Sequence, residues 1–264
     1  MWFISLRQLI QRFSILNTSI LIFIFGACHS PGFSKVAAGF DTLQIQPYDV
    51  LASPSIFEKA FFKGAFSVTE DRDSVHFFQL NIGNINIETG KIIAADVVTQ
   101  YDMPPFTQNF PIGRFPVLLS VARLRNNDER IAFSQIVFPQ DTITHWEYAL
   151  HGNQKPASIF SDTLYSYGVD AGVGLFIDEK SNNAFKKLSD NIADLMQKYI
   201  FKGLNDQTHT SWQYNIQSFP GGNLAAFSTG WGDGHYATYI GFNKNEKPCR
   251  LLTDFALINW WKNE

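Results

Sequence analysis

Short stretches of apolar and β-branched residues, separated by turn-forming residues, follow one another through most of the chain after residue 70. Residues 84–88 alternate apolar and polar, as in a half-buried strand, whereas 174–177 are continuously apolar, as in a strand buried on both faces. Turns are expected at Thr89-Gly90, at Gly232-Asp233-Gly234 and at 243–247, because Asp-Gly between apolar runs is a strong hairpin signal. The strands expected from this pattern are 75–82, 84–88, 91–98, 117–124, 131–139, 145–150, 174–177, 224–229, 235–242 and 249–258.

Apolar residues at three- and four-residue steps predict one long helix over residues 182–202. Ser181 is its expected N-cap and Gly203 its expected end. A shorter helix is expected at 54–63. The fold class predicted is therefore α+β, mainly antiparallel β-sheet with one long helix packed on it. The apolar stripe of that helix comprises Phe185, Leu188, Ile192, Leu195, Met196, Tyr199 and Ile200.

The N-terminus has the pattern of an export signal. Arg7 and Arg12 precede a short apolar run at 15–27, and the small residues Gly26-Ala27 stand directly before Cys28. The run of about 13 residues is shorter than the roughly 20 that a membrane-spanning helix needs. Small residues followed by cysteine resemble the lipobox of bacterial lipoproteins, in which the cysteine becomes the acylated first residue after cleavage.

Cleavage before Cys28 would divide the chain into three parts. Residues 1–27 are expected to be a lipoprotein signal peptide, 28–44 a tether, and 45–264 a single β-rich domain. A lipid on Cys28 would anchor the exported domain at a membrane of the bacterial cell envelope, either inner or outer. An ordinary secretion signal and an uncleaved anchor helix are the alternatives.

Composition narrows the choice of partners. The formal net charge is −3, and loss of Arg7 and Arg12 with the signal makes it −5. A mildly acidic chain without basic blocks argues against nucleic acid as a partner. Lipid on Cys28 would remove the one available disulfide partner of Cys249, so the domain is expected to fold without a disulfide. The aromatic content of 15% predicts a well-packed β core, with an aromatic ligand groove as the alternative.

Acidic residues and one histidine in three motif segments are the main candidates for catalysis. Asp170, Asp178, Asp233, His235 and the segment 253–255 would supply carboxylates and one imidazole, groups that hold a divalent metal or transfer protons. Their spacing matches no calcium, zinc, phosphate-binding or serine-hydrolase motif, so no metal or cofactor is assigned. The alternative role for Asp170 and Asp233 is turn formation, because Asp beside Gly hydrogen-bonds its own turn. The residues selected as catalytic candidates are Asp170, Asp233 and His235.

Aromatic residues near the same glycine-rich turn are candidates for binding. Trp231 lies within that turn, and Tyr236 and Tyr239 follow it. The two tyrosines are three residues apart, so on a strand they point to opposite faces, with one in the core and the other exposed. Exposed aromatics at such a turn suit contact with a sugar or a protein, and core packing is the alternative.

A series of short motifs follows in order along the chain. They are Gly83…Glu88-Thr89-Gly90-Lys91…Asp96, Pro111-Ile112-Gly113-Arg114…Pro116-Val117, Arg130-Ile131-Ala132, Tyr167-Gly168-Val169-Asp170-Ala171-Gly172…Asp178, Ser228-Thr229-Gly230-Trp231-Gly232-Asp233-Gly234-x-Tyr236 and Thr253-Asp254-Phe255. In this order they resemble a bacterial family known only as domain of unknown function 4241, over roughly 60–258. The resemblance implies no activity, cofactor or catalytic residue.

Two functional hypotheses follow. The first is a non-enzymatic binding or recognition module of the cell envelope, tethered through Cys28, with a neighbouring or toxic protein as one kind of partner. The second is a hydrolase, with or without a metal, which requires Asp170, Asp178, Asp233 and His235 to converge on one pocket. The placement of Asp170 relative to Asp233 is the observation that separates them.

Overall fold

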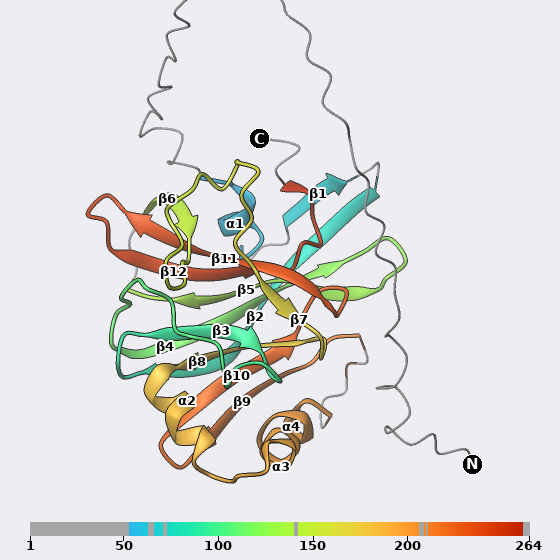
Figure 1. Ribbon diagram of the computed structural model, residues 1–264. Helices are drawn as coiled ribbons and strands as arrows, with labels where there is room; N and C mark the ends of the chain where they lie inside the picture. Colours follow the sequence, from blue (N-terminus) through green and yellow to red (C-terminus); the bar gives the residue numbers. More distant parts are fainter. Residues whose placement is uncertain are drawn as a thin grey trace, which may run out of the picture. The chain divides into compact units, whose positions relative to one another are not determined.

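Strands paired edge to edge in two antiparallel sheets form the framework of the chain (Figure 1). The computed structural model describes residues 53–62, 66–70, 73–139, 142–205, 209 and 211–260, all within one compact unit that spans 45–264. The large sheet has the order β1 (Phe66–Glu70), β2 (Asp73–Ile87), β4 (Gly113–Arg123), β5 (Glu129–Val137), β12 (Pro248–Asp254), β11 (Gly234–Asn243) and β6 (Ile143–Tyr148), and β7 (Tyr167–Val169) pairs with the start of β11. The small sheet has the order β3 (Ile92–Asp96), β8 (Val173–Asp178), β10 (Gly222–Ser228) and β9 (Tyr214–Phe219).

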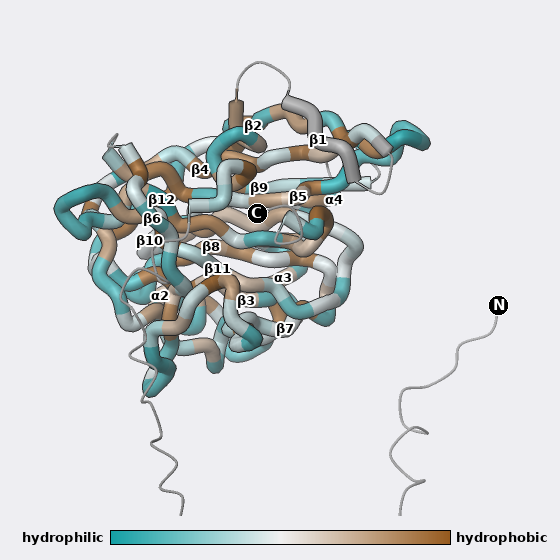
Figure 2. The backbone as a smooth tube through the Cα atoms, turned by 90° about the horizontal axis from the view of Figure 1, so that it is seen from above, coloured by the Kyte–Doolittle hydropathy of each residue, from teal (hydrophilic) through white to brown (hydrophobic). Residues whose placement is uncertain are grey.

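Alternation along the strands distributes the buried side chains among three cores. On β10, Phe227 points into the inter-sheet core and Ala226 into the core beneath the helices. On β11, Tyr236 points into the inter-sheet core and Tyr239 into a third core on the outer face of the large sheet. Figure 2 shows hydrophobic segments in the strands and hydrophilic ones in many of the connecting turns. We call the third the outer core, and its buried aromatic residues are Phe57, Phe61, Phe77, Phe133, Trp146, Tyr148, Tyr239 and Trp260.

Most of the expected strands are present. The two strands expected at 75–82 and 84–88 are one continuous strand, β2, whose register with β4 shifts between Asn81 and Gly83. Gly83 has a φ of 124°, which glycine adopts without strain, so it bends the strand rather than ending it. The sequence pattern did not predict β1, β7 or β9. The expected fold class is confirmed as mainly antiparallel β-sheet.

The prediction of one long helix over 182–202 is wrong. The helices in this region are α2 (Glu179–Lys186) and a second helical stretch made of α3 (Ile192–Met196), the π-helical turn η2 (Gln197–Phe201) and α4 (Lys202–Asn205). Both helical stretches nevertheless pack on the same side of the small sheet, and six of the seven predicted stripe residues contribute to its core. The exception is Ile192, at the start of α3, which is 44% exposed.

Local hydrogen bonding explains the break. Asn191 accepts hydrogen bonds from the backbone N–H groups of Ala193 (3.1 Å) and Asp194 (3.4 Å), and therefore starts a new helix. Asn191 donates its own backbone N–H to Ser189 Oγ at 3.1 Å. Ser and Asn offer the backbone such alternatives to helical bonds, so the segment 187–191 interrupts an otherwise helical pattern. The N-cap of α2 is Asp178 rather than the expected Ser181.

The first described helix, α1 (Ile56–Lys59), lies within the segment expected to be helical at 54–63 and buries Ile56 and Phe57 in the outer core. The predicted signal peptide, the tether and Cys28 lie outside the described residues. Among the helices that the structure describes, none has the length and apolar character needed to cross a bilayer.

Truncation of Leu195 to alanine is expected to lower the free energy of unfolding by about 3 kcal/mol, because its side chain is buried beneath the small sheet. Leu188→Ala is the matched control and should cost about half as much, since Leu188 lies at the edge of the same core and is half-buried. Guanidinium unfolding measures both. Equal losses would contradict the placement of the apolar stripe.

Candidate functional site

The structure places two of the three catalytic candidates on neighbouring turns. Val169 pairs with Gly234, so Asp170 and Asp233 leave the β7–β11 ladder at the same end. Both side chains are exposed, and so is that of His235. Among the described residues, no group of three or more His, Cys, Asp or Glu side chains is arranged to hold a metal ion. The catalytic roles of Asp170, Asp233 and His235 stay predictions.

Asp178 does not join this group. It ends β8, whereas Asp170 lies before the start of β8, and five strand steps of about 3.3 Å separate the two ends of that strand. Its buried carboxylate accepts hydrogen bonds from Glu88 N, Thr89 N, Thr89 Oγ1 and Lys180 N. Asp178 therefore holds the turn after β2 and the start of α2. The hydrolase hypothesis expected Asp178 to share one pocket with the other three candidates, and that expectation is wrong.

The turn that carries Asp170 is also held by a buried carboxylate. Asp96 Oδ2 accepts hydrogen bonds from Asp170 N at 2.6 Å and Ala171 N at 2.8 Å, and its Oδ1 accepts from Val98 N at 2.6 Å. Asp96 itself is fully buried. The backbone of Asp170 thus has a structural partner, while its side chain points to solvent.

The three aromatic candidates occupy three different environments. Trp231 is 60% exposed, and the Arg130 guanidinium lies 5.2 Å from the centre of its ring. Tyr236 is buried in the inter-sheet core and donates its hydroxyl to Gly232 O at 2.8 Å, so it supports the glycine-rich turn. Tyr239 is buried on the opposite face of β11, as the three-residue spacing predicts, but neither tyrosine is exposed.

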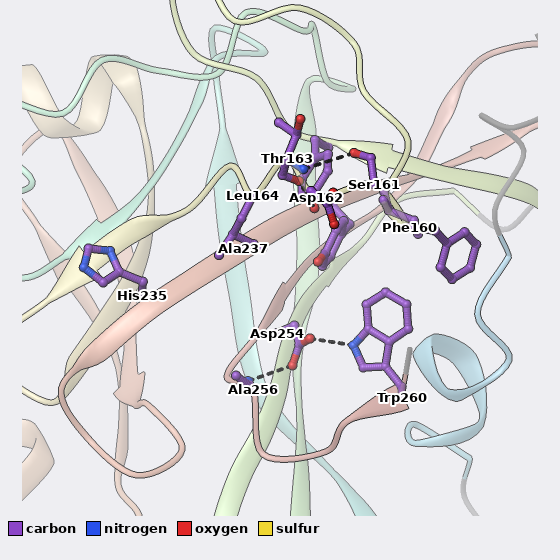
Figure 3. A pocket seen from close by; sticks show the side chains of 13 residues that line it. Phe160, Ser161, Asp162, Thr163, Leu164, His235, Ala237, Asp254, Ala256 and Trp260 are labelled. Carbon is purple, nitrogen blue, oxygen red and sulfur yellow. Dashed lines mark hydrogen bonds between the residues drawn. The ribbon is translucent and has the colours of Figure 1, made fainter. Parts of the chain in front are cut away.

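Tyr239 and His235 share a pocket of about 590 Å³ on the outer face of the large sheet (Figure 3). His235, Ala237 and Tyr239 lie two residues apart along β11, so their side chains emerge on one face. We call this cavity the Asp254 pocket. Its lining residues are Tyr148, Ile159, Phe160, Ser161, Asp162, Thr163, Leu164, His235, Ala237, Tyr239, Asp254, Ala256 and Trp260.

Asp254 provides the one carboxylate of the lining that is buried. Trp260 Nε1 donates to its Oδ2 at 2.7 Å, and Ala256 N donates to its Oδ1 at 2.9 Å (Figure 3). Burial raises the pKa of Asp254 to about 6, although these two hydrogen bonds favour the ionised form and lower it. A buried carboxyl with such a pKa changes its charge near neutral pH, which is a property of many functional sites.

Neighbouring tyrosines make the rest of the floor polar without adding positive charge. Burial raises the pKa of Tyr239 well above its ordinary value, and the negative charge of Asp254 raises it further. Burial likewise raises the pKa of Tyr148, with a smaller contribution from Asp254. Both hydroxyls therefore stay protonated at neutral pH. Their rings lie with centroids 5.1 Å apart beside the carboxylate.

Two alanines leave room for a ligand. Ala237 lies between His235 and Tyr239 on the same face of β11, where a larger side chain would fill the pocket. Ala256 has a φ of 50°, a conformation that non-glycine residues adopt rarely and at some energetic cost. In this conformation its N–H reaches Asp254. Strained backbone of this kind is frequent at binding sites.

An irregular segment, residues 149–166, forms the wall opposite the sheet. It contains neither helix nor strand, and ordered connections of this length are uncommon inside compact domains and are often binding or active-site loops. Tyr148 Oη donates to Thr163 O at 3.0 Å and attaches the segment to the floor of the pocket. Phe160 and Leu164 remain 48% and 61% exposed at the rim, which presents apolar surface to an incoming ligand.

Burial of Asp254 predicts a specific dependence of stability on pH. Between about pH 4 and pH 6 the folded chain keeps a proton that the unfolded chain has lost, so the free energy of unfolding falls as pH rises, by about 3 kcal/mol. In Asp254→Asn this contribution is absent, so the variant should gain about 2–3 kcal/mol relative to the parent chain between pH 4 and pH 7.5, which is most of the total change. Urea unfolding at both pH values tests this. Asp162→Asn, an exposed carboxylate of the same lining, is the control, and a parent–variant difference that does not change with pH would contradict the prediction.

Sequence reasoning found part of this site. His235 and Tyr239 were candidates and line the pocket, and Asp254 was considered as a carboxylate of the segment 253–255 but was not among the residues selected as catalytic. The signals it missed are the small residues Ala237 and Ala256 and the partner Trp260, six residues after Asp254. The local sequence feature that indicates a cavity is Ala237, a small residue two positions before Tyr239 on a predicted strand, so that both side chains lie on one face.

Comparison with known proteins identifies a family whose function is unknown. No curated protein and no solved structure matches the chain. Residues 85–253, well over half of the chain, match the model of a family described as protein of unknown function (DUF4241). The matched segment starts near the end of β2 and stops one residue before Asp254, so it leaves out β1, residues 73–84 of β2 and the last residue of β12. The chain therefore belongs to the DUF4241 family of proteins of unknown function.

Proposed function

We propose that this chain is a binding module of the bacterial cell envelope, tethered to a membrane through lipid on Cys28, and that its ligand occupies the Asp254 pocket. The observation that carries the proposal is the pocket itself, with Asp254 buried at its floor between a sheet and the segment 149–166. Its volume of about 590 Å³ is within the range of pockets that bind small molecules.

The chemistry of the lining supports binding. Small-molecule pockets combine an apolar wall with a few polar groups that orient the ligand. Here the rings of Phe160, Tyr239 and Trp260 supply the apolar wall, and Asp254 supplies a fixed polar group. The floor is pre-organised, because Trp260 and Ala256 hold both carboxylate oxygens in place.

Filling the pocket tests the binding role. The full chain in detergent would be titrated with 2-phenylethanol, a neutral ring compound, by ligand-observed NMR, and an affinity on the order of millimolar is expected for so small a ligand. Ala237→Phe should weaken it at least tenfold, because the new ring occupies the cavity. Ala193→Phe, at an exposed position on α3, is the control and should bind as the parent does. Equal binding by Ala237→Phe and the parent would overturn the pocket assignment.

The membrane tether rests on the N-terminal pattern and is tested separately. Cys28→Ala should move the protein from the membrane fraction to the supernatant after osmotic lysis of expressing cells, because no residue would remain to carry the lipid. Cys249→Ala is the matched control and should stay in the membrane fraction. Membrane association that survives Cys28→Ala would favour the uncleaved anchor helix.

The hydrolase alternative keeps one supporting observation, the neighbouring turns of Asp170 and Asp233. Metal content of the purified chain, and its melting temperature with and without a chelator, discriminate between the two functions. Bound metal, with a melting temperature that drops on chelation and no longer does so in Asp170→Asn and Asp233→Asn, would favour the hydrolase. Chelation that leaves the melting temperature unchanged would favour the binding module.

A further inference from the structure

The charges around the Asp254 pocket are of one sign. Its described lining contains two carboxylates, Asp254 and Asp162, one histidine, and neither lysine nor arginine. Asp254 is buried and Asp162 is exposed. Oriented groups of one sign in a low-dielectric cleft attract ligands of the opposite charge. The pocket therefore favours a cation over an anion.

The Asp254 carboxylate has neutral partners in the described part of the chain. Trp260 Nε1 and Ala256 N each donate one hydrogen bond, and none of the ion pairs between described residues involves Asp254. Each carboxylate oxygen accepts about two hydrogen bonds, so both keep acceptor capacity. The titratable groups that face Asp254 or share its pocket are Tyr148, Tyr236, Tyr239, Asp162 and His235.

Aromatic rings surround the same carboxylate. Tyr148 and Tyr239 lie on the strands beside it, and Trp260 donates to it directly. Phe160 contacts Trp260 edge to face, with ring centroids 6.0 Å apart, and closes the side of the pocket. Recognition of organic ammonium ions uses this combination, because ring faces attract cations and a carboxylate forms charge-assisted hydrogen bonds with them.

We propose that the Asp254 pocket binds an organic ammonium ion, with the cationic head on the Asp254 carboxylate and the apolar body among the rings of Tyr148, Tyr239 and Trp260. The proposal rests on the proposed function, since it names the ligand class of the same pocket. Asp162 at the rim adds a second negative charge along the path of entry. A bound cation also supplies the counter-charge that the buried carboxylate lacks within the described structure.

Isosteric probes test the charge preference. The full chain in detergent at pH 7.5 would be titrated with phenethylammonium and with 2-phenylethanol, which have the same shape but differ in charge. We expect the cation to bind at least tenfold more tightly than the alcohol, and Asp254→Asn to abolish this difference while still binding the alcohol. Equal affinities in the parent chain would overturn the ammonium assignment and leave the pocket function intact. Binding of neither probe would overturn both.

A pH titration of the parent chain gives a second readout that needs no variant. With the pKa of Asp254 at about 6, only about one carboxylate in 30 stays ionised at pH 4.5, so phenethylammonium binding should weaken relative to pH 7.5, by about eightfold for a tenfold charge preference and by up to about 30-fold for a larger one. Phenethylammonium keeps its charge throughout this range, and the affinity for 2-phenylethanol should stay constant. Cation affinity that does not change between these pH values would assign recognition to a group other than Asp254 and overturn the proposal.

Lys262 lies outside the described residues and is close to Trp260 in sequence, so it needs its own control. Lys262→Gln should leave the affinity for phenethylammonium within twofold of that of the parent chain. That result would show that the Asp254 carboxylate is available to the ligand and is not paired with Lys262. A gain of tenfold or more would show that Lys262 already neutralises Asp254, and would overturn the proposal.

Discussion

Replacement of Asp178 by alanine is expected to lower the free energy of unfolding by about 4–5 kcal/mol. The buried carboxylate accepts from Thr89 N (3.0 Å), Thr89 Oγ1 (2.7 Å) and Glu88 N (3.1 Å), and it caps α2 through Lys180 N (2.9 Å). Alanine leaves all four donors without this acceptor. Hydrogen bonds to a charged group contribute about 1.5–3 kcal/mol each, and loss of a cap costs about 1 kcal/mol. The expected total is at the low end of their sum, because water can reach donors on the exposed residues Glu88, Thr89 and Lys180.

Two variants separate the carboxylate from a simple helix cap. Asn191→Ala removes an exposed cap with similar hydrogen bonds, at the start of α3, and should cost only about 1 kcal/mol. Asp178→Asn keeps one acceptor oxygen and should fall between the two. Guanidinium unfolding at pH 7 measures all three. A loss in Asp178→Ala no larger than that in Asn191→Ala would show that the turn after β2 holds without the carboxylate.

This result would bear on function as well as on stability. Asp96 and Asp178 end the paired strands β3 and β8, and each carboxylate is occupied by backbone donors. Carboxylates used in this way hold turns in place. A buried aspartate at the end of a strand in this chain therefore does not by itself locate chemistry, whereas Asp254 differs because it lines a pocket.

The strands were predictable because their signals are local. β10, β11 and β12 are apolar runs bounded by glycine or asparagine turns, and their observed limits lie within a few residues of the expected ones. The helix prediction was wrong for a physical reason: a stripe with helical spacing continues through 187–191, where Ser189 and Asn191 bond to the backbone and break the helix. Periodicity reports which face is buried, and hydrogen bonding decides where a helix ends.

The site was predictable only in part because it is assembled from distant segments. Spacing along β11 places His235 and Tyr239 on one face, and that much follows from sequence. The opposite wall comes from the irregular segment 149–166, which has no periodic signal, and the burial of Asp254 depends on Trp260 and that segment together. The raised pKa of Asp254 is a consequence of this tertiary burial, so sequence spacing gives no sign of it.

Phe57→Ala is expected to cost about 4–5 kcal/mol, the upper part of the range for buried phenylalanine. Phe57 is fully buried on α1, and its ring centroid lies 5.0 Å from Tyr239, 5.1 Å from Trp146 and 4.9 Å from Trp260. The cavity left by the missing ring is enclosed by large aromatic side chains that cannot collapse to fill it. Phe62→Ala, at a position 68% exposed, is the matched control and should change stability by less than about 0.5 kcal/mol.

The same substitution tests whether α1 positions the binding site. Trp260 contacts Phe57 on one side and donates to Asp254 on the other, so loss of the Phe57 ring should loosen the indole that orients the carboxylate. A double-mutant cycle of Phe57→Ala with Trp260→Phe should give a coupling energy of about 1 kcal/mol, the magnitude of one aromatic pair. Additive effects would indicate that Phe57 contributes to core packing and does not position Trp260. Coupling would mean that α1, the first described element of the chain, supports the floor of the Asp254 pocket through Trp260.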